Sequence, residues 1–115
     1  MVIYHGNAPL PGTPEAERMP EEDKKAAFAD YAALAEIENW SGAPPMGLPQ
    51  NATIVTVTDG APVLTDGPWL DIRHTVGGFA VVEAPDLDAA VALAAQVPRA
   101  RLGGAVEVRP SVSLF

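Results

Sequence analysis

The stretch from Thr65 to Phe79 constrains the fold most, because most of the special backbone chemistry of the chain is concentrated there. Asp66-Gly67-Pro68 combines an acceptor side chain, a residue free to take positive φ and a residue with φ locked at about −65°. This composition predicts a tight, fixed turn that delivers the aromatic side chain of Trp69 to one defined place. Such a turn either only reverses the chain or also lines a pocket, and the sequence leaves both interpretations open.

A hairpin is predicted directly before this turn. Residues 51–58 alternate in polarity, with Val55 and Val57 on one face, which predicts a strand with one drier face. Asp59-Gly60 is a strong signal for a two-residue hairpin loop, after which the chain returns through residues 62–65. Pro62 cannot donate a backbone hydrogen bond. The returning strand is therefore expected to lie at a sheet edge or to begin at Pro62.

The segment before the hairpin predicts a strand, a loop and a helix. Residues 2–4 predict a short strand, and the prolines within 8–19 predict a surface loop without regular structure. Pro20 and the acids after it are typical of a helix start, and Ser41-Gly42 is expected to end that helix. The apolar face of this helix is predicted to comprise Ala27, Phe28, Tyr31, Leu34 and Ala35.

The segment after the turn predicts a second strand–helix unit and a last strand. Residues 79–83 are almost wholly apolar, which predicts a strand covered on both faces. Asp86 is placed to cap a helix that Pro98 ends, and residues 105–109 alternate as a final strand. The core stripe of this helix is predicted to comprise Leu87, Ala90, Val91, Ala94 and Val97.

The order strand, helix, hairpin, strand, helix, strand predicts one domain, residues 1–115, with an α+β fold. Two crossovers joined by a hairpin give a ferredoxin-like split βαβ sandwich with both helices on one sheet face. Because the strands supply apolar residues on both sides, the other face is expected to meet a second copy. We therefore predict a homodimer, in which a partner chain also covers Leu114 and Phe115.

Composition excludes several classes of function. The 115-residue chain has a net charge of −8, from fifteen acids and seven bases, so nucleic acid and anionic membranes are not expected partners. It has no apolar run of membrane-spanning length and no signal sequence, so a cytoplasmic location is expected. Without cysteine, thiol nucleophiles, disulfides and thiolate ligands are impossible. Since His5 and His74 are the only imidazoles, no metal site is expected, and since Gly77-Gly78 lacks the context of a nucleotide-binding motif, no cofactor is expected either.

Several separated motifs resemble one family. They are Leu64-Thr65-Asp66-Gly67-Pro68-Trp69, Gly77-Gly78-Phe79, Asp86-Leu87-Asp88-Ala89-Ala90 and Gly104-Ala105-Val106-Glu107-Val108-Arg109-Pro110. In this order and spacing, over about residues 51–110, the chain resembles the YCII-related family in its DGPF branch. The resemblance implies a ferredoxin-like fold, dimers of the dimeric α/β barrel type and a cleft beside the sheet. It does not imply one particular activity.

The chain departs from the family pattern at three points. Trp69 stands where the branch usually has phenylalanine, which keeps an aromatic ring and adds an indole donor. His74 replaces the last acid of a segment that usually reads acid-x-basic-acid. Family members outside this branch carry a histidine on the first helix, proposed to pair with an acid in catalysis. That region of this chain has no imidazole, so the dyad is not carried over.

The candidate catalytic residues are Asp66, His74 and His5. Asp66 is either an acceptor for backbone N–H groups of its own turn or a carboxylate acting as base or substrate anchor. His74 follows Asp71 by three positions, so an imidazole beside a carboxylate could form a general base, although an unpaired surface histidine is the alternative. His5 follows the first strand, whose end approaches the cleft in this fold.

The candidate substrate-binding residues are Tyr4, Trp69, Asp71 and Arg73. Trp69 could instead be an anchor for the core or for an interface. The leading hypothesis is a homodimer that binds a small organic molecule, with possible cofactor-free acid–base catalysis. One alternative is a non-catalytic regulatory or protein-binding module associated with an extracytoplasmic-function sigma factor, which the resemblance also implies. Another is that the dimer is purely a scaffold.

Overall fold

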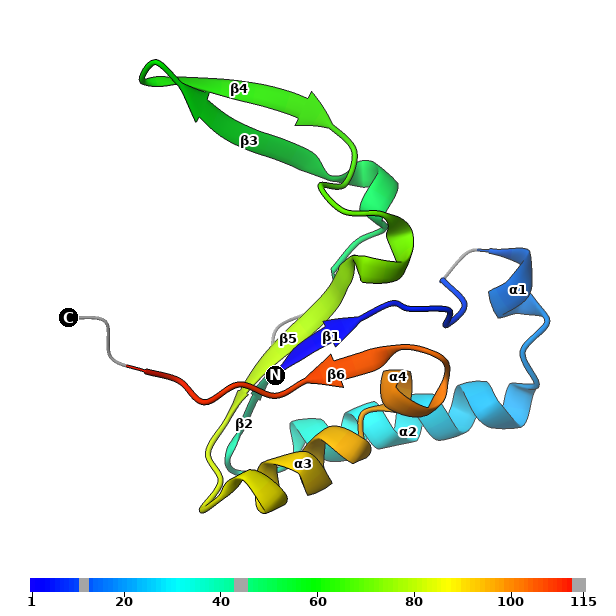
Figure 1. The fold of residues 1–115 in the computed structure, drawn as a ribbon. Helices are drawn as coiled ribbons and strands as arrows, with labels where there is room; N and C mark the ends of the chain where they lie inside the picture. Colours follow the sequence, from blue (N-terminus) through cyan, green and yellow to red (C-terminus); the bar gives the residue numbers. More distant parts are fainter. Residues whose placement is uncertain (11–12, 43–45, 113–115) are drawn as a thin grey trace.

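The computed structural model describes residues 1–10, 13–42 and 46–112 (Figure 1). These form an α+β fold around a four-stranded antiparallel sheet with strand order β2-β5-β1-β6. This order places the first strand between the third and the last strands of the sheet, which is consistent with a ferredoxin-like fold. The four strands are β1 (Val2–Tyr4), β2 (Trp40–Gly42), β5 (Val76–Val82) and β6 (Ala105–Glu107).

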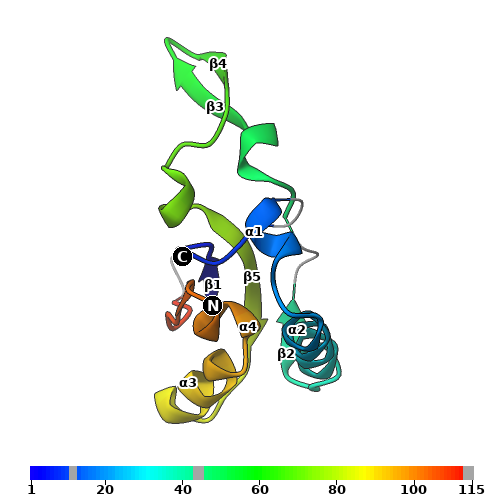
Figure 2. The same ribbon diagram turned by 90° about the vertical axis from the view of Figure 1, so that its right-hand side faces the viewer.

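The helices cover one face of this sheet, as the sequence predicts (Figures 1 and 2). The two longer ones are α2 (Glu21–Ala35) and α3 (Leu87–Ala95), and α4 (Pro98–Arg101) adds one turn. Asp86 caps α3 as predicted, because its Oδ1 accepts a hydrogen bond from the Ala89 N–H at 2.8 Å. Among the described residues, no helix is long and apolar enough to cross a bilayer.

Two predictions about the segment between β1 and β2 are wrong. A short helix, α1 (Pro14–Glu17), lies inside the segment expected to be irregular, because the Thr13 side chain caps it and Pro14 begins it. The longer helix, α2, ends at Ala35, so Ser41-Gly42 does not terminate it. Ser41 and Gly42 instead belong to β2, which pairs with β5.

The core between sheet and helices is small. Ile3 from β1 meets Leu34 from α2 and Val97, the residue that precedes α4, and Ile37, Trp40 and Val106 pack around them. Ala90, Ala94 and Val97 are buried, as the predicted stripe of the second helix requires, but Leu87 and Val91 are exposed. On α2, Leu34 is buried whereas Phe28 is exposed, because only the C-terminal part of that helix reaches the core.

The predicted hairpin exists but is not part of the sheet. It comprises β3 (Thr53–Thr58) and β4 (Ala61–Asp66), joined by Asp59 and Gly60 with φ of 50° and 78°. Two positive φ angles are typical of the type I′ turn that the Asp-Gly pair predicts. The hairpin forms a separate two-stranded ribbon that stands away from the sheet and the helices (Figures 1 and 2).

The sheet face opposite the helices, here called the open face, is not covered in the single chain. Side chains alternate along β5, so Ala80 points to the helices and is buried, while Phe79 and Val81 are exposed on the open face. The sequence predicts a strand covered on both faces. Within the described part of the chain, β5 is covered on one.

Candidate functional site

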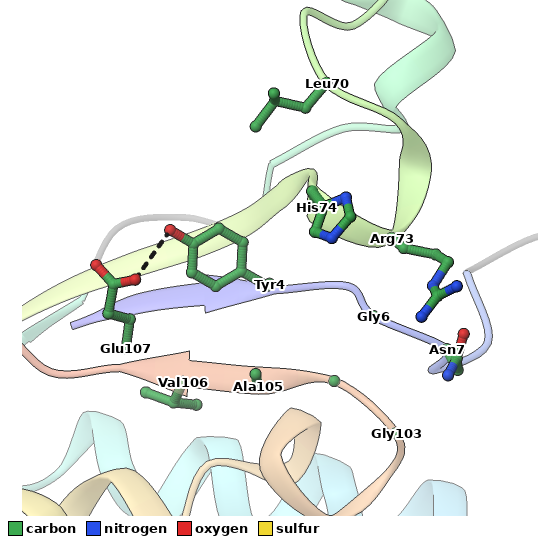
Figure 3. Close-up of a pocket in the computed structure, with 11 residues that line it drawn as sticks. Tyr4, Gly6, Asn7, Leu70, Arg73, His74, Gly103, Ala105, Val106 and Glu107 are labelled. Atoms are coloured by element: carbon green, nitrogen blue, oxygen red, sulfur yellow. Dashed lines mark hydrogen bonds between the residues drawn. The ribbon is translucent and has the colours of Figure 1, made fainter.

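A cleft of about 780 Å³ lies at the end of β1. Figure 3 shows its walls, with Leu70 and His74 on one side and the start of β6 on the other. Tyr4, Ala105 and Glu107 share the open face of the sheet, since Tyr4 pairs directly with Ala105. The lining residues are Tyr4, Gly6, Asn7, Leu70, Arg73, His74, Gly103, Gly104, Ala105, Val106 and Glu107.

Backbone hydrogen bonds assemble this cleft from three distant segments. The chain after β1 continues alongside η2 (Ile72–His74), where the Gly6 N–H donates to the Arg73 carbonyl at 3.0 Å. On its other side the Asn7 N–H donates to the Gly103 carbonyl at 2.7 Å. These bonds hold the short helical turn that carries Arg73 and His74 beside the end of β1, next to Tyr4.

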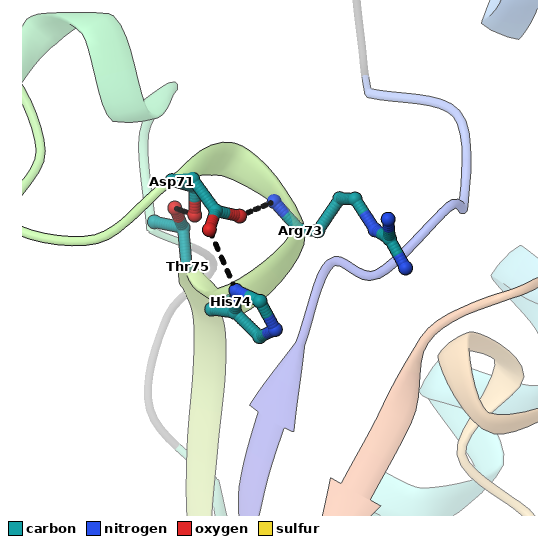
Figure 4. A network of polar contacts seen from close by, with 4 residues as sticks. All are labelled: Asp71, Arg73, His74 and Thr75. Atoms are coloured by element: carbon teal, nitrogen blue, oxygen red, sulfur yellow. Dashed lines mark hydrogen bonds and ion pairs between the residues drawn. The ribbon is translucent and has the colours of Figure 1, made fainter.

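Asp71 and His74 form a hydrogen-bonded pair, of which His74 lines the cleft and Asp71 does not (Figure 4). The His74 Nδ1 lies 2.8 Å from the Asp71 Oδ2, and the other carboxylate oxygen accepts the Arg73 N–H at 3.0 Å. The bond from His74 is the main reason why the pKa of Asp71 lies below its ordinary value. With the Nδ1 proton shared with this carboxylate, Nε2 keeps a lone pair and can accept a proton.

Tyr4 and Glu107 form a second polar contact across the cleft floor. The Tyr4 hydroxyl donates to the Glu107 Oε2 at 3.5 Å (Figure 3). Glu107 also pairs with Arg109. Glu107 was not among the sequence-predicted site residues. The signal that could have found it is the sheet order itself, because the last strand lies beside the first and brings Glu107 to the face of Tyr4.

His5 does not line the cleft. Its side chain is only 5% exposed, and neither ring nitrogen has a hydrogen-bond partner among the described residues. The ring packs on Gly77, where an added Cβ would come within 2.8 Å of the His5 Cε1. Burial, with a further contribution from the positive charge of Arg99, lowers the pKa of His5 below its ordinary value of 6.5.

The buried His5 predicts a stability that falls in mild acid. Below pH 6.5 the unfolded chain protonates this imidazole more readily than the folded chain does, so the free energy of unfolding falls as the pH drops. Urea denaturation at several pH values between 7.5 and 5 measures this slope. His5→Phe should flatten it, and making both measurements in a His74→Gln background removes the other imidazole from the comparison. An identical slope with and without His5 would contradict the prediction.

Asp66 and Trp69 lie outside the cleft. Asp66 ends β4, opposite Thr53, and its exposed carboxylate makes no hydrogen bond to a described residue. The turn after it is held instead by the Gly67 N–H, which donates to the Ala52 carbonyl at 2.8 Å. Trp69 is 74% exposed, and its neighbour Leu70 lines the cleft in its place. The structure thus brings together Tyr4, Arg73, His74 and Asp71, but not Asp66, Trp69 or His5.

No metal ligand set is visible in residues 1–10, 13–42 and 46–112. Within these ranges, no three or more His, Asp or Glu side chains are grouped so that they could hold an ion. The cleft itself presents an imidazole that is hydrogen-bonded to a carboxylate, a guanidinium and a phenol.

Comparison with known proteins identifies the family. A search of curated proteins finds no match. The sequence model of the YCII-related domain matches residues 13–113, which include the hairpin, the Asp71–His74 pair and the last strand of the sheet. The match covers most of the chain and confirms the resemblance that the sequence motifs indicate. The chain belongs to the YCII-related domain family.

Proposed function

We propose that this protein binds a small organic molecule in the cleft beside β1 and that the Asp71–His74 pair acts there as a general base without a cofactor. The observation that carries the proposal is the 2.8 Å contact by which Asp71 holds His74, since His74 lines a cleft that also presents Arg73 and Tyr4. An imidazole oriented by a carboxylate is a common base for proton transfer near neutral pH.

The proposed reaction is abstraction of a proton next to a carbonyl or carboxyl group. His74 Nε2 takes the proton from the substrate, and the Asp71 carboxylate stabilises the imidazolium that forms. The electron pair of the broken bond moves onto the substrate oxygen, where the Arg73 guanidinium stabilises the negative charge. The Tyr4 hydroxyl, which donates its proton to Glu107, is placed to accept a hydrogen bond from the substrate. Return of the proton to another atom completes an isomerisation.

Arg73 favours ligands that carry an oxyanion. Among the residues that the structure describes it makes no ion pair, and its guanidinium extends along the cleft toward Asn7 (Figure 3). A guanidinium binds a carboxylate through two parallel hydrogen bonds, which adds both affinity and orientation. Small carboxylic acids and aromatic acids are therefore the first compounds to screen by thermal shift, with lactones as neutral counterparts that lack the carboxylate.

For a compound found in this way, Arg73→Gln should raise the dissociation constant by about tenfold or more, because a charge-assisted contact is lost. Isothermal titration calorimetry measures the change. Arg18→Gln is the matched control: it removes the same charge from an exposed position outside the cleft, and should leave the dissociation constant unchanged. Equal weakening by both variants would mean that only net charge matters, and would contradict binding in this cleft.

We also propose that the protein is a homodimer of the dimeric α/β barrel type, in which the open faces of two chains meet. Exposed Phe79 and Val81 support this arrangement, since adjoining apolar side chains on a sheet face gain stability when a second surface excludes water.

The alternative function is a protein-binding module for a sigma factor of the extracytoplasmic-function type. The exposed acids of α1 and the first turn of α2, namely Glu15, Glu17, Glu21, Glu22 and Asp23, favour a basic partner. Failure of every compound in the thermal-shift screen, together with salt-sensitive binding to a purified sigma factor, would favour this alternative over the cleft.

A further inference from the structure

The projecting hairpin, residues 53–66, is here called the arm, and it has no packing partner in the single chain. Within the described residues, β3 and β4 make substantial contacts only with each other. An isolated two-stranded hairpin is marginally stable in water, because it buries too little apolar surface to offset the ordering of its backbone. The arm therefore requires a surface that covers it.

One face of the arm is apolar beyond its base, where Thr53 and Asp66 lie on that same face. Strand pairing places Val55 opposite Leu64, and Val57 opposite Pro62, so that all four side chains lie on the same face. The side chains of Val55, Val57 and Leu64 are between 61% and 70% exposed. The other face mixes apolar residues with threonine. The apolar face is the surface that a partner would cover, with exposed Trp69 near the base of the arm.

The accessible surface of the chain indicates how large that partner contact is. The chain exposes 8204 Å², whereas a folded monomer of 12.0 kDa exposes about 6,000 Å². The excess is about 2,200 Å², more than the roughly 800 Å² that each partner buries in a standard interface. An excess of this size is typical of subunits from obligate dimers, and the extents of 48 × 43 × 19 Å describe a correspondingly flat molecule.

We propose that the apolar face of each arm packs on a second copy of this chain, so that two arms clasp the dimer. This inference rests on the proposed homodimer and adds a second contact to the meeting of open faces. A second copy is the favoured occupant because each chain supplies both apolar surfaces, the arm and the open face with Phe79 and Val81. In a two-fold dimer every contact occurs twice, which doubles its contribution to the free energy of association.

The first test compares the two faces of the arm by sedimentation velocity. Val57→Lys should raise the dimer dissociation constant by about 100-fold, since burial of one valine is worth about tenfold and two arms are affected. Val57→Thr keeps the β-branched shape and should give a smaller increase in the same direction. The matched control is Thr65→Lys, which places the same charge on the opposite face of the arm and should leave the dissociation constant nearly unchanged.

The second test does not depend on how well a lysine variant folds. The chain has no cysteine, so a Val57→Cys variant has a single thiol. Its rate of maleimide labelling should fall at least tenfold as the protein concentration rises through the dimer range. A Thr65→Cys variant should label at a nearly constant rate. Equal rates for the two thiols at every concentration would overturn the arm contact.

A third variant distinguishes failure of the arm contact from failure of the dimer. Val81→Lys changes the open face and not the arm, and should weaken the dimer independently. If Val81→Lys raises the dimer dissociation constant and Val57→Lys leaves it unchanged, the arm contact alone is refuted. A wild-type chain that stays monomeric at every concentration tested would refute both the arm contact and the proposed homodimer.

Discussion

Leu34→Ala is expected to lower the free energy of unfolding by about 3 kcal/mol, because truncation of a buried leucine loses its transfer energy and leaves a cavity. Leu34 is 1% exposed and joins Ile3 and Val97 in a core with few other members. Small domains have a total stability of about 5–15 kcal/mol, so this loss is a large fraction of the whole. Urea denaturation at one fixed protein concentration measures it, since dimerisation makes stability depend on concentration.

Phe28→Ala is the control for this prediction. Phe28 lies on the same helix but is 78% exposed, so its truncation should change the free energy of unfolding by less than about 0.5 kcal/mol. The sequence places both residues on one apolar face of the helix, whereas the structure separates them. Similar losses for the two variants would mean that this helix packs differently from the structure described.

Gly6→Ala is expected to cost about 3 kcal/mol and to disrupt the cleft. Gly6 has φ of +58°, which any other L-residue adopts with strain, and an added Cβ would lie 2.4 Å from the Gly103 carbonyl oxygen. The backbone must then move apart at the point where the Asn7 N–H donates to Gly103. Urea denaturation gives the energy, and faster hydrogen exchange of the Asn7 amide reports the opened cleft.

Gly47→Ala is the matched control for Gly6→Ala. An added Cβ at Gly47 has no described atom within 4 Å, and the φ of Gly47 is not positive. The free energy of unfolding of the Gly47→Ala variant should therefore stay within about 0.5 kcal/mol of the wild-type value. Normal stability and normal Asn7 exchange in the Gly6→Ala variant would contradict the close approach of these two segments.

The candidate site was predictable only in part. The spacing of Asp71 and His74 predicts an imidazole beside a carboxylate, and the structure pairs them at 2.8 Å. The Asp66-Gly67-Pro68 turn suggested a pocket at Asp66, but that residue ends the arm and lies outside the cleft. His5 lies between the lining residues Tyr4 and Gly6, as its place after the first strand predicts, but its own side chain is buried. The spacing of residues in the sequence indicates which side chains lie close together along the chain. Which residues line a cleft depends instead on which distant segments pair, so it cannot be predicted from spacing.

The sequence by itself determined the elements with strong local signals: the type I′ hairpin at Asp59-Gly60, the helix capped by Asp86 and the YCII-related family. Each depends on residues a few positions apart, whose backbone preferences act before any long-range contact forms. Tertiary structure alone decided that Trp40–Gly42 joins the sheet and that the hairpin stands outside it. Which strand pairs with β5 depends on the relative free energies of the alternative pairings. These pairings join residues far apart in the chain, so no local sequence pattern encodes them.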